Sequence, residues 1–312
     1  MERRTFLQHL AVASGALPLL SLTQTGSEQA PSKRPPILVF SKHLHFLPYK
    51  EMAEKAKELG FDGVDLTVRP GGHVLPERVE EDLPKAVEAI RKAGLDPTMM
   101  TTAIERADSP LDSRVLHTAA RLGIRYYRMN WYRYSPEETM PQSLQKYRTQ
   151  VAALSQLNKQ LNLVGCYQNH AGMLIGSSIW EVWEMLRDAD PATMGTQYDI
   201  RHATVEGGLS WQNGLRLIYP HIKVLAVKDS IWEQSNGQWR AKNVPIGQGM
   251  VDYKTYFKLL KQYQVHVPIS MHFEYDLGGA DRGERTLTIP KEEVYTAMRR
   301  DIQMLHRLWD EA

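Results

Sequence analysis

The 312-residue chain has very little cysteine: Cys166 is its only one, so no intramolecular disulfide can form. It also lacks runs of lysine and arginine, and its formal net charge is only +2, so nothing in it resembles a nucleic-acid-binding surface. With 42% hydrophobic and 24% charged residues, the composition is typical of a soluble globular protein. Cys166 lies inside an apolar run and is predicted to be a buried, inert thiol.

Residues 1–30 look like an export signal and the start of a linker. Arg3 and Arg4 form a twin-arginine pair, and the apolar stretch that follows, Leu10 to Leu22, is too short to span a bilayer comfortably. Receptors read such signals as addresses, so we expect a periplasmic protein exported by the twin-arginine pathway, with no stable membrane anchor. An ordinary amphipathic N-terminal helix is the alternative.

The rest of the chain, residues 36–312, alternates short apolar runs with helical patterns. The predicted strands are 36–41, 63–68, 98–102, 125–131, 163–168, 194–199, 222–227 and 268–273. The predicted helices are 49–59, 83–93, 113–122, 143–161, 178–189, a segment around 211–218, 253–262 and 291–309. Eight strand–helix units in one domain of this size predict an α/β fold, a closed (β/α)8 TIM barrel. An insertion at 232–249 fills the excess length before the last strand.

The competing fold is a doubly wound open sheet, which needs a glycine-rich phosphate turn after its first strand. Here the first strand ends in Ser41-Lys42-His43-Leu44-His45, with no glycine. We therefore favour the barrel and expect no nucleotide cofactor.

Polar side chains follow the predicted strands, where the sites of such barrels form. They are Lys42, His43 and His45; Arg69 and His73; Asn130 and Trp131; Gln168, Asn169 and His170; Asp199 and His202; Lys228 and Asp229; His272 and Glu274. Asp199 and Glu274 each close an apolar strand, where an acid is rarely found without a partner. The alternative is that these side chains have only structural roles. They would then be solvated loop residues or hydrogen-bonded residues of the barrel wall, and the tryptophan would simply pack over the barrel mouth.

On these residues the chain resembles the xylose isomerase-like barrels of the sugar phosphate isomerase/epimerase superfamily. The resemblance covers nearly everything after residue 35 and is closest to exported bacterial members with a twin-arginine signal. The motifs are Phe61-Asp62-Gly63-Val64-Asp65-Leu66, Tyr167-Gln168-Asn169-His170, Asp199-x-x-His202, Lys228-Asp229, Gly247-x-Gly249-x-x-Asp252 and Glu274. Each motif is weak alone, and their order and spacing together are fairly specific.

The resemblance implies a divalent cation such as Mn²⁺, Mg²⁺ or Zn²⁺, held by Glu, Asp, His and Glu on strands five to eight. The two glutamates also act as acid–base groups. Asp199 and Glu274 match this pattern, whereas Gln168 and Ala226 stand where the first Glu and the His would be. A glutamine oxygen can bind a hard cation but carries no charge. The metal is therefore lost, or held by a weakened set of Asp199, Glu274 and Gln168, or by a rearranged set that includes His170, His272 or Glu206.

The resemblance and the strand ends together favour a sugar isomerase or epimerase. It would act on a free sugar or keto-sugar derivative by removing a proton next to a carbonyl group. Glu274 is the expected base, and Lys228, His202 or a weakly held cation is expected to stabilise the enediolate oxygen. The expected substrate-binding residues are Lys42, His43, Arg69, His73, Trp131, His170 and His272.

Two other functions remain open for the same pocket. One is a lyase or hydratase that acts on an oxidised glycoside. The other is a catalytically inactive sugar-binding barrel, which the two replaced ligands support. An abasic-site endonuclease is disfavoured because neither a three-zinc ligand cluster nor a basic groove is visible. The expected partner is a small-molecule carbohydrate, and a homo-oligomer is compatible with the sequence.

Overall fold

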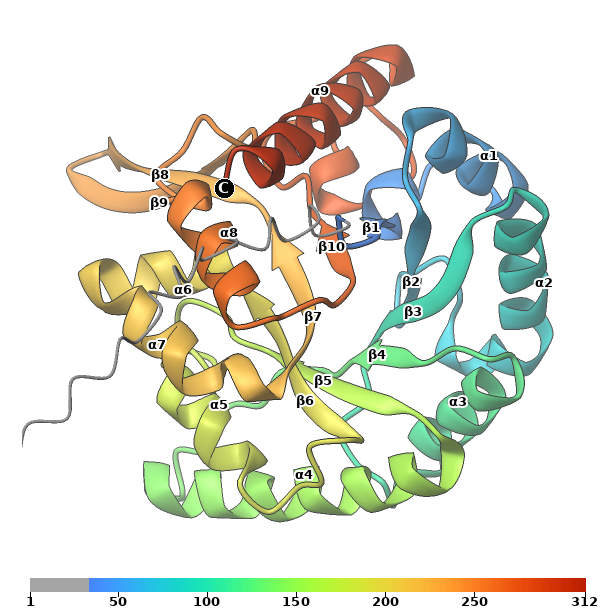
Figure 1. Cartoon of the computed structure of the whole chain (residues 1–312). Helices are drawn as coiled ribbons and strands as arrows, with labels where there is room; N and C mark the ends of the chain where they lie inside the picture. The colour runs from blue at the N-terminus through green and yellow to red at the C-terminus, as the bar shows by residue number, and fades with distance from the viewer. Residues whose placement is uncertain (1–33) are drawn as a thin grey trace, which may run out of the picture. The chain divides into compact units, whose positions relative to one another are not determined.

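The computed structural model describes residues 34–312, and the predicted export signal lies outside the described residues. In this part of the chain eight parallel strands close into a barrel, with neighbours in the order β1-β10-β7-β6-β5-β4-β3-β2. Figure 1 shows the barrel strands at the centre, with helices surrounding them. The predicted (β/α)8 barrel is confirmed.

The structure gives the following bounds. The barrel strands are β1 (Ile37–Phe40), β2 (Gly63–Val68), β3 (Asp96–Thr102), β4 (Tyr126–Arg128), β5 (Val164–Gln168), β6 (Met194–Asp199), β7 (Ile222–Val227) and β10 (Ile269–Met271). The helices are α1 (Tyr49–Leu59), α2 (Val79–Lys92), α3 (Pro110–Arg121), α4 (Met140–Leu161), α5 (Ile179–Leu186), α6 (Ile200–Gly207), α7 (Trp211–Ile218), α8 (Tyr253–Gln262) and α9 (Lys291–Asp310). Across residues 34–312, none of them is both long and apolar enough to cross a membrane.

Two apolar layers hold the barrel together. Inside it lies a small cluster contributed by alternate strands β1, β3, β5 and β7, as the layered packing of such barrels requires. Its members are Leu38, Met99, Val164, Cys166 and Val224. The larger cluster lies between the strands and the surrounding helices. Cys166 is fully buried, as predicted from its apolar setting.

Most element ends follow local signals. Helix α1 stops at Gly60, which adopts a left-handed conformation with φ of 94°. Helix α4 begins at Met140, three residues before the predicted start, because Thr139 and Gln142 form a capping box at its N-terminus. The apolar periodicity on which the prediction relied begins only later in the helix.

The predicted insertion is a β-hairpin formed by β8 (Asp229–Ser235) and β9 (Gln238–Val244). Asn236 and Gly237 both have positive φ in the turn, at 51° and 75°, the geometry favoured in two-residue hairpin loops. The hairpin lies at the carboxyl end of β7 (Figure 1). It is therefore placed to cover part of the barrel mouth.

Candidate active site

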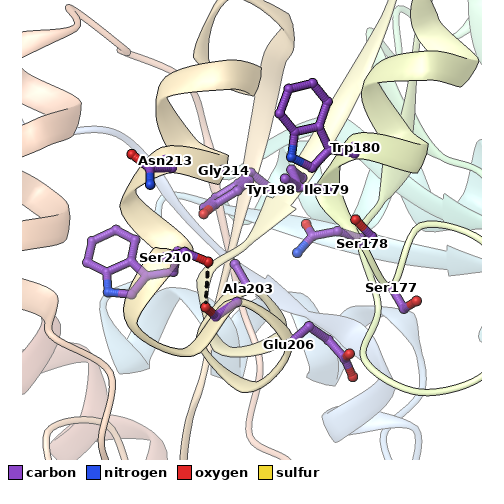
Figure 2. Close-up of a pocket in the computed structure, with 13 residues that line it drawn as sticks. Ser177, Ser178, Ile179, Trp180, Tyr198, Ala203, Glu206, Ser210, Asn213 and Gly214 are labelled. Carbon is purple, nitrogen blue, oxygen red and sulfur yellow. Dashed lines mark hydrogen bonds between the residues drawn. The ribbon is translucent and has the colours of Figure 1, made fainter.

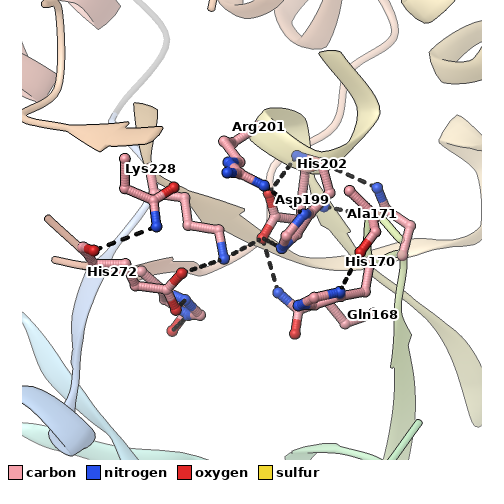
Figure 3. A network of polar contacts seen from close by, with 12 residues as sticks. Gln168, His170, Ala171, Asp199, Arg201, His202, Lys228 and His272 are labelled. Atoms are coloured by element: carbon pink, nitrogen blue, oxygen red, sulfur yellow. Dashed lines mark hydrogen bonds and ion pairs between the residues drawn. The ribbon is translucent and has the colours of Figure 1, made fainter. Parts of the chain in front are cut away.

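Three charged side chains meet at the carboxyl ends of β6, β7 and β10. The Lys228 Nζ atom lies 2.8 Å from Glu274 Oε2 and 3.3 Å from Asp199 Oδ2. Lys228 and Asp199 are almost fully buried, with side-chain exposures of 4% and 0%, whereas that of Glu274 is 22%. Figure 3 shows Lys228 reaching toward Asp199. The ammonium thus separates two carboxylates that would otherwise repel each other.

Asp199 is fixed by neighbours on every side. Its Oδ2 accepts a hydrogen bond from Gln168 Nε2 (2.8 Å), and its Oδ1 accepts one from the backbone N–H of His202 (3.0 Å), which caps helix α6. Burial by itself raises the pKa of Asp199, but the Lys228 ammonium and the hydrogen bond from the backbone N–H of His202 oppose burial, and the pKa is lowered to about 2. Asp199 is therefore an ionised, immobile anchor.

Glu274 is the carboxylate of this cluster that reaches the barrel mouth. Its Oε1 accepts a hydrogen bond from Lys42 Nζ (3.3 Å), and its Oε2 accepts one from Lys228. Burial alone raises the pKa of Glu274, but the two ammonium groups hold the pKa well below its usual value. Glu274 is therefore ionised at neutral pH and able to accept a proton.

The histidines of the site are neutral. Burial is the main reason that the pKa values of His170, His202 and His272 are all lowered. His202 Nδ1 accepts a hydrogen bond from the guanidinium of Arg201 (3.1 Å), which leaves its Nε2–H facing Asp199 Oδ2 at 3.7 Å. His202 therefore supports Asp199 and carries no positive charge of its own.

His272 belongs to a chain of polar groups that runs down into the barrel. Ser270 Oγ donates to Asp65 Oδ2 (2.6 Å), so it accepts from His272 Nε2 (3.2 Å), and the opposite ring nitrogen lies 3.5 Å from Glu274 Oε1. The ring also stacks on Phe40 at 4.4 Å between centroids. Ser270 and Phe40 thus hold the His272 ring beneath Glu274, and its Nδ1 makes no hydrogen bond within residues 34–312.

An aromatic wall borders the site on the side of β4 and β5. The indole of Trp131 meets His170 edge-on at 4.7 Å, and His170 lies 4.0 Å from the ring of His202. The guanidinium of Arg128 lies 4.1 Å from the centroid of the Trp131 ring. Because these rings pack on one another, Trp131 and His170 form a rigid edge of the mouth.

Two expected substrate-binding residues are used up by the fold. His43 Nδ1 donates to the Ala280 carbonyl (3.1 Å), and its Nε2 accepts the backbone N–H of Phe273 (3.0 Å). The ring nitrogens of His73 lie within hydrogen-bond distance of Ser41 Oγ (3.1 Å) and the Leu47 carbonyl (3.3 Å). Both rings hold loops in place and have no free nitrogen for a ligand. Lys42, Arg69, Trp131, His170 and His272, by contrast, lie around the mouth.

Several site residues escaped the sequence reasoning. Arg128 ends β4 and donates to Gln168 Oε1 (3.2 Å), and Arg201 in α6 also donates to the Ala241 carbonyl of the hairpin (3.2 Å). The available signal for Arg128 was a charged residue in the interior of the predicted strand 125–131. The interior carboxylate of Asp65 accepts hydrogen bonds from Thr101 and Ser270.

Asp229 holds the turn Gly247–Val251 that follows the hairpin. Its carboxylate accepts backbone N–H groups from Gly247, Gly249 and Val251, all between 3.0 and 3.2 Å. A Cβ atom at Gly249 would collide with this carboxylate. Asp229 therefore fixes the loop beside Lys228 and does not face a ligand.

The side chains do not fit a divalent cation. In residues 34–312, no group of three His, Cys, Asp or Glu side chains is arranged to hold a metal ion. Gln168 turns its amide N–H, a donor, toward Asp199, and Ala226 pairs with Asp199 across the sheet but offers no ligand atom. The Lys228 ammonium lies between the two remaining carboxylates and neutralises the charge that would attract a cation.

A cavity of about 520 Å³ lies between α5, α6 and α7, apart from the cluster of Lys228, Asp199 and Glu274 (Figure 2). Its wall includes Trp180, Tyr198 and Glu206, and Glu206 accepts the backbone N–H of Gly172 (2.9 Å). Glu206 thus belongs to this cavity and not to the Lys228 cluster, although the sequence suggested it as a rearranged metal ligand.

Comparison with known proteins agrees with the barrel fold. A family model described as "Xylose isomerase-like TIM barrel" matches residues 53–296, whereas no curated protein matches the chain. The probable 3-DHS dehydratase AsbF from Bacillus anthracis is 14% identical, with a TM-score of 0.63, over 87% of this chain and 98% of that chain.

Two epimerase structures are similar to the same extent. D-psicose 3-epimerase in the presence of D-fructose is 13% identical, with a TM-score of 0.62, over 88% of this chain and 99% of that chain. The 3-keto-D-glucoside 4-epimerase YcjR from E. coli is 15% identical, with a TM-score of 0.62, over 88% of this chain and 100% of that chain. At such low identity, these likenesses show the fold.

Proposed function

Since the chain belongs to the xylose isomerase-like TIM barrel family, we propose that it is an isomerase or epimerase that moves a proton next to the carbonyl group of a sugar or keto-sugar derivative. One observation carries this proposal. Glu274 is a partly exposed carboxylate at the barrel mouth, held ionised between the ammonium groups of Lys42 and Lys228. A proton acceptor beside a fixed positive charge is what carbon-acid chemistry requires.

The proposed reaction begins when Glu274 takes a proton from the carbon next to the carbonyl. The electron pair of that C–H bond forms a C=C bond, and negative charge moves to the carbonyl oxygen. Lys228 lies 2.8 Å from Glu274 and is placed to donate a hydrogen bond to that oxygen. Its charge is already buried in the apolar barrel, so it stabilises the enediolate without reorganisation.

Isomerisation follows when Glu274 returns the proton to the neighbouring carbon and the hydroxyl proton passes between the two oxygens. This route needs only one carboxylate base. Gln168, in the place of the second glutamate, cannot accept a proton. It is also held by Arg128 and Asp199 through both ends of its amide. A single base is therefore more consistent with this site than two carboxylates acting on opposite faces.

Dehydration is the second candidate, because it also uses one base. Glu274 would again remove the proton, the electron pair would form a C=C bond as the hydroxyl group leaves the next carbon, and the proton held by Glu274 would pass to that group so that it leaves as water. The structure of a probable dehydratase with the same fold supports keeping this reaction in view. A sugar-binding barrel without activity is the remaining alternative.

The family's divalent cation is not needed for this proposal. We propose that the Lys228 ammonium supplies the positive charge at the developing oxyanion, since it contacts the two carboxylates that match the family's ligands. Small carbohydrates are the proposed substrates because the mouth combines an aromatic edge, Trp131, with several hydrogen-bonding side chains.

The test is exchange of carbon-bound hydrogen in D₂O, followed by NMR over a panel of aldoses, ketoses and keto-glycosides. We expect the wild-type protein to exchange the proton next to the carbonyl, and Glu274→Gln to lose about a hundredfold or more of the rate. Glu233→Gln is the matched control, because Glu233 is an exposed hairpin residue paired with Lys242. Unchanged exchange in a folded Glu274→Gln protein would place the base elsewhere, with His170 and His272 next.

A further inference from the structure

A second feature of the barrel mouth is a cavity of about 430 Å³ beside Glu274, formed where β1 to β4 end. Four cationic side chains line it: Lys42, Arg69, Arg128 and Arg282. No aspartate or glutamate side chain is part of its wall. Such a one-signed pocket attracts anions.

Arg128 is the most unusual of the four. It is only 3% exposed, yet its Nε has no hydrogen-bond partner among residues 34–312, and its Nη1 bonds only to the neutral Gln168. Burial and the nearby guanidinium of Arg69 lower the pKa of Arg128 to about 9, so it is still charged at neutral pH. A buried guanidinium with an open donor is costly unless an anion completes it.

Arg69 adds a second charge of the same kind. Burial lowers its pKa, and its guanidinium lies 5.5 Å from the centroid of the Phe40 ring. Neither Arg69 nor Arg128 is within 4.0 Å of a carboxylate of the described chain. Asp65 and Glu274 act on both at longer range, and their oxygens are hydrogen-bonded to Thr101 and Ser270 and to Lys42 and Lys228. Two guanidinium groups therefore face the cavity without counter-ions.

The cavity is joined to the reaction centre by direct contacts. Lys42 lines the cavity and donates to Glu274 Oε1 at 3.3 Å. Arg128 lines it too and donates to Gln168, which in turn donates to Asp199. A small molecule bound here by one end would present its neighbouring carbons to Glu274.

We propose that this cavity binds the oxyanion group of the substrate, a carboxylate or a phosphate, so that the protein acts on an acidic sugar and not on a neutral one. The inference rests on the proposed function for its reaction centre. Arg69 and Arg128 provide planar donors that match the oxygens of either group, and Lys42 adds a point charge near Glu274. Arg282, whose side chain is 63% exposed and paired with Asp281, contributes long-range attraction only.

The test is calorimetric titration of the full-length protein with D-glucuronate, D-glucose 6-phosphate and D-glucose at low and high salt. We expect at least one of the two acidic sugars to bind tenfold or more tightly than D-glucose, with weaker binding at high salt. The one preferred identifies the anionic group as carboxylate or phosphate. Arg69→Gln should lower this affinity by about tenfold to a hundredfold, the usual effect of losing a charged hydrogen bond.

If Arg128→Gln does not fold, Arg128→Lys takes its place in the test. This variant keeps the positive charge but should still weaken the binding of acidic sugars by about tenfold, because the planar donor pair is lost. Arg307→Gln, an exposed residue of α9, is the control and should change nothing. Equal or absent binding of both acidic sugars, or unchanged affinity in the Arg69 and Arg128 variants, overturns the proposal.

The same titration separates this inference from the proposed function. Glu274→Gln removes the base but leaves Arg69 and Arg128 in place, so it should still prefer acidic sugars. Anion preference without hydrogen exchange would uphold the cavity and reject the reaction. Hydrogen exchange on neutral sugars, without a preference for anions, would uphold the reaction and reject the anion-binding cavity.

Discussion

Lys228 shows how one side chain can change the chemistry of a site. The two carboxylates it contacts are the ones that match metal ligands of the family, and the other two ligand positions hold Gln168 and Ala226. Three neutral or cationic residues thus replace the environment that a divalent ion needs. Each difference is consistent with the others, which is why we regard the ammonium as the resident positive charge.

This arrangement predicts how metal binding responds to mutation. After chelation, Mn²⁺ should not raise the unfolding temperature of the wild-type protein. The triple variant Gln168→Glu, Ala226→His, Lys228→Ala restores the family's ligand types, and Mn²⁺ should stabilise it by about 2.7 kcal/mol at a hundredfold excess over Kd. Lys242→Ala in the same assay is the control, because Lys242 lies on the exposed hairpin.

Thermal unfolding with and without Mn²⁺, together with elemental analysis, gives the answer. Stoichiometric metal that survives extended chelation of the wild-type protein would contradict the prediction. It would mean that Lys228 moves aside when a cation arrives.

At the scale of secondary-structure elements, the segment between β7 and α8 is held by a close contact between Asp229 and the backbone at Gly249. The carboxylate of Asp229 receives backbone N–H groups from a loop in which Gly249 leaves no room for a side chain. We predict that Gly249→Ala destabilises the protein by about 1–3 kcal/mol, as overpacking usually does. Because Asp229 follows Lys228 directly, turnover should fall as well.

Urea unfolding measures the loss of stability, and exchange of the substrate's carbon-bound hydrogen in D₂O measures the loss of turnover. Gly207→Ala is a useful comparison, because Gly207 has an ordinary φ of −87° and a Cβ there would approach only Trp211, at 3.3 Å. Equal stability of the Gly249 and Gly207 variants would show that the loop adjusts freely.

Much of the fold was predictable at this scale because eight apolar strands alternate with amphipathic helices, and the alternation dictates the barrel. Asp199, Lys228 and Glu274 were predictable together because each follows a strand end, and strand ends converge. Helix α6 was not predicted, since the residue that caps its N-terminus is Asp199, a candidate site residue at the end of a predicted strand.

The histidines show what sequence cannot supply. His43 and His73 follow strands just as Lys42 and Arg69 do, but a turn of the 3-10 helix Ser41–Leu44 and a tight loop point them toward backbone groups. Which way a side chain turns after a strand depends on loop geometry, and spacing alone does not determine it.

For the molecule as a whole, buried neutral histidines predict acid sensitivity. Burial lowers the pKa of His45 to about 4 and that of His73 to about 3, whereas an unfolded histidine titrates near 6.5. Below pH 6.5 the unfolded chain therefore binds protons that the folded chain does not. Stability is fully present above pH 6.5 and is lost as the pH falls toward 4 and 3.

Each such histidine contributes up to about 1.4 kcal/mol per pH unit in this window. Urea unfolding at pH 7.5, 6.5 and 5.5 should show a flat region followed by a decline. Below pH 6.5, His73→Gln should reduce the slope of the free energy of unfolding against pH by about the contribution of one histidine. A pH-independent free energy of unfolding over this range would contradict the prediction.

Export is the other whole-molecule property, and it rests on residues outside the described structure. We propose that the chain is periplasmic because of its twin-arginine pair. Replacing both residues, Arg3→Lys with Arg4→Lys, should leave the protein in the cytoplasm, because a receptor reads the pair. Immunoblotting of cell fractions tests this. An unchanged periplasmic yield would argue for a different route.

The sealed thiol in the barrel has a practical consequence for optical work. Cys166 has 0% exposure, and burial raises the pKa of its thiol, so it does not react with maleimide dyes. A fluorophore attached through Gln238→Cys at the exposed tip of the hairpin would therefore be the only label. Because Arg201 donates to Ala241 and Asn243 donates to the Glu274 carbonyl, the hairpin is bonded to the site. The emission of this fluorophore would therefore report the entry of a ligand into the site, in a chain that is otherwise native.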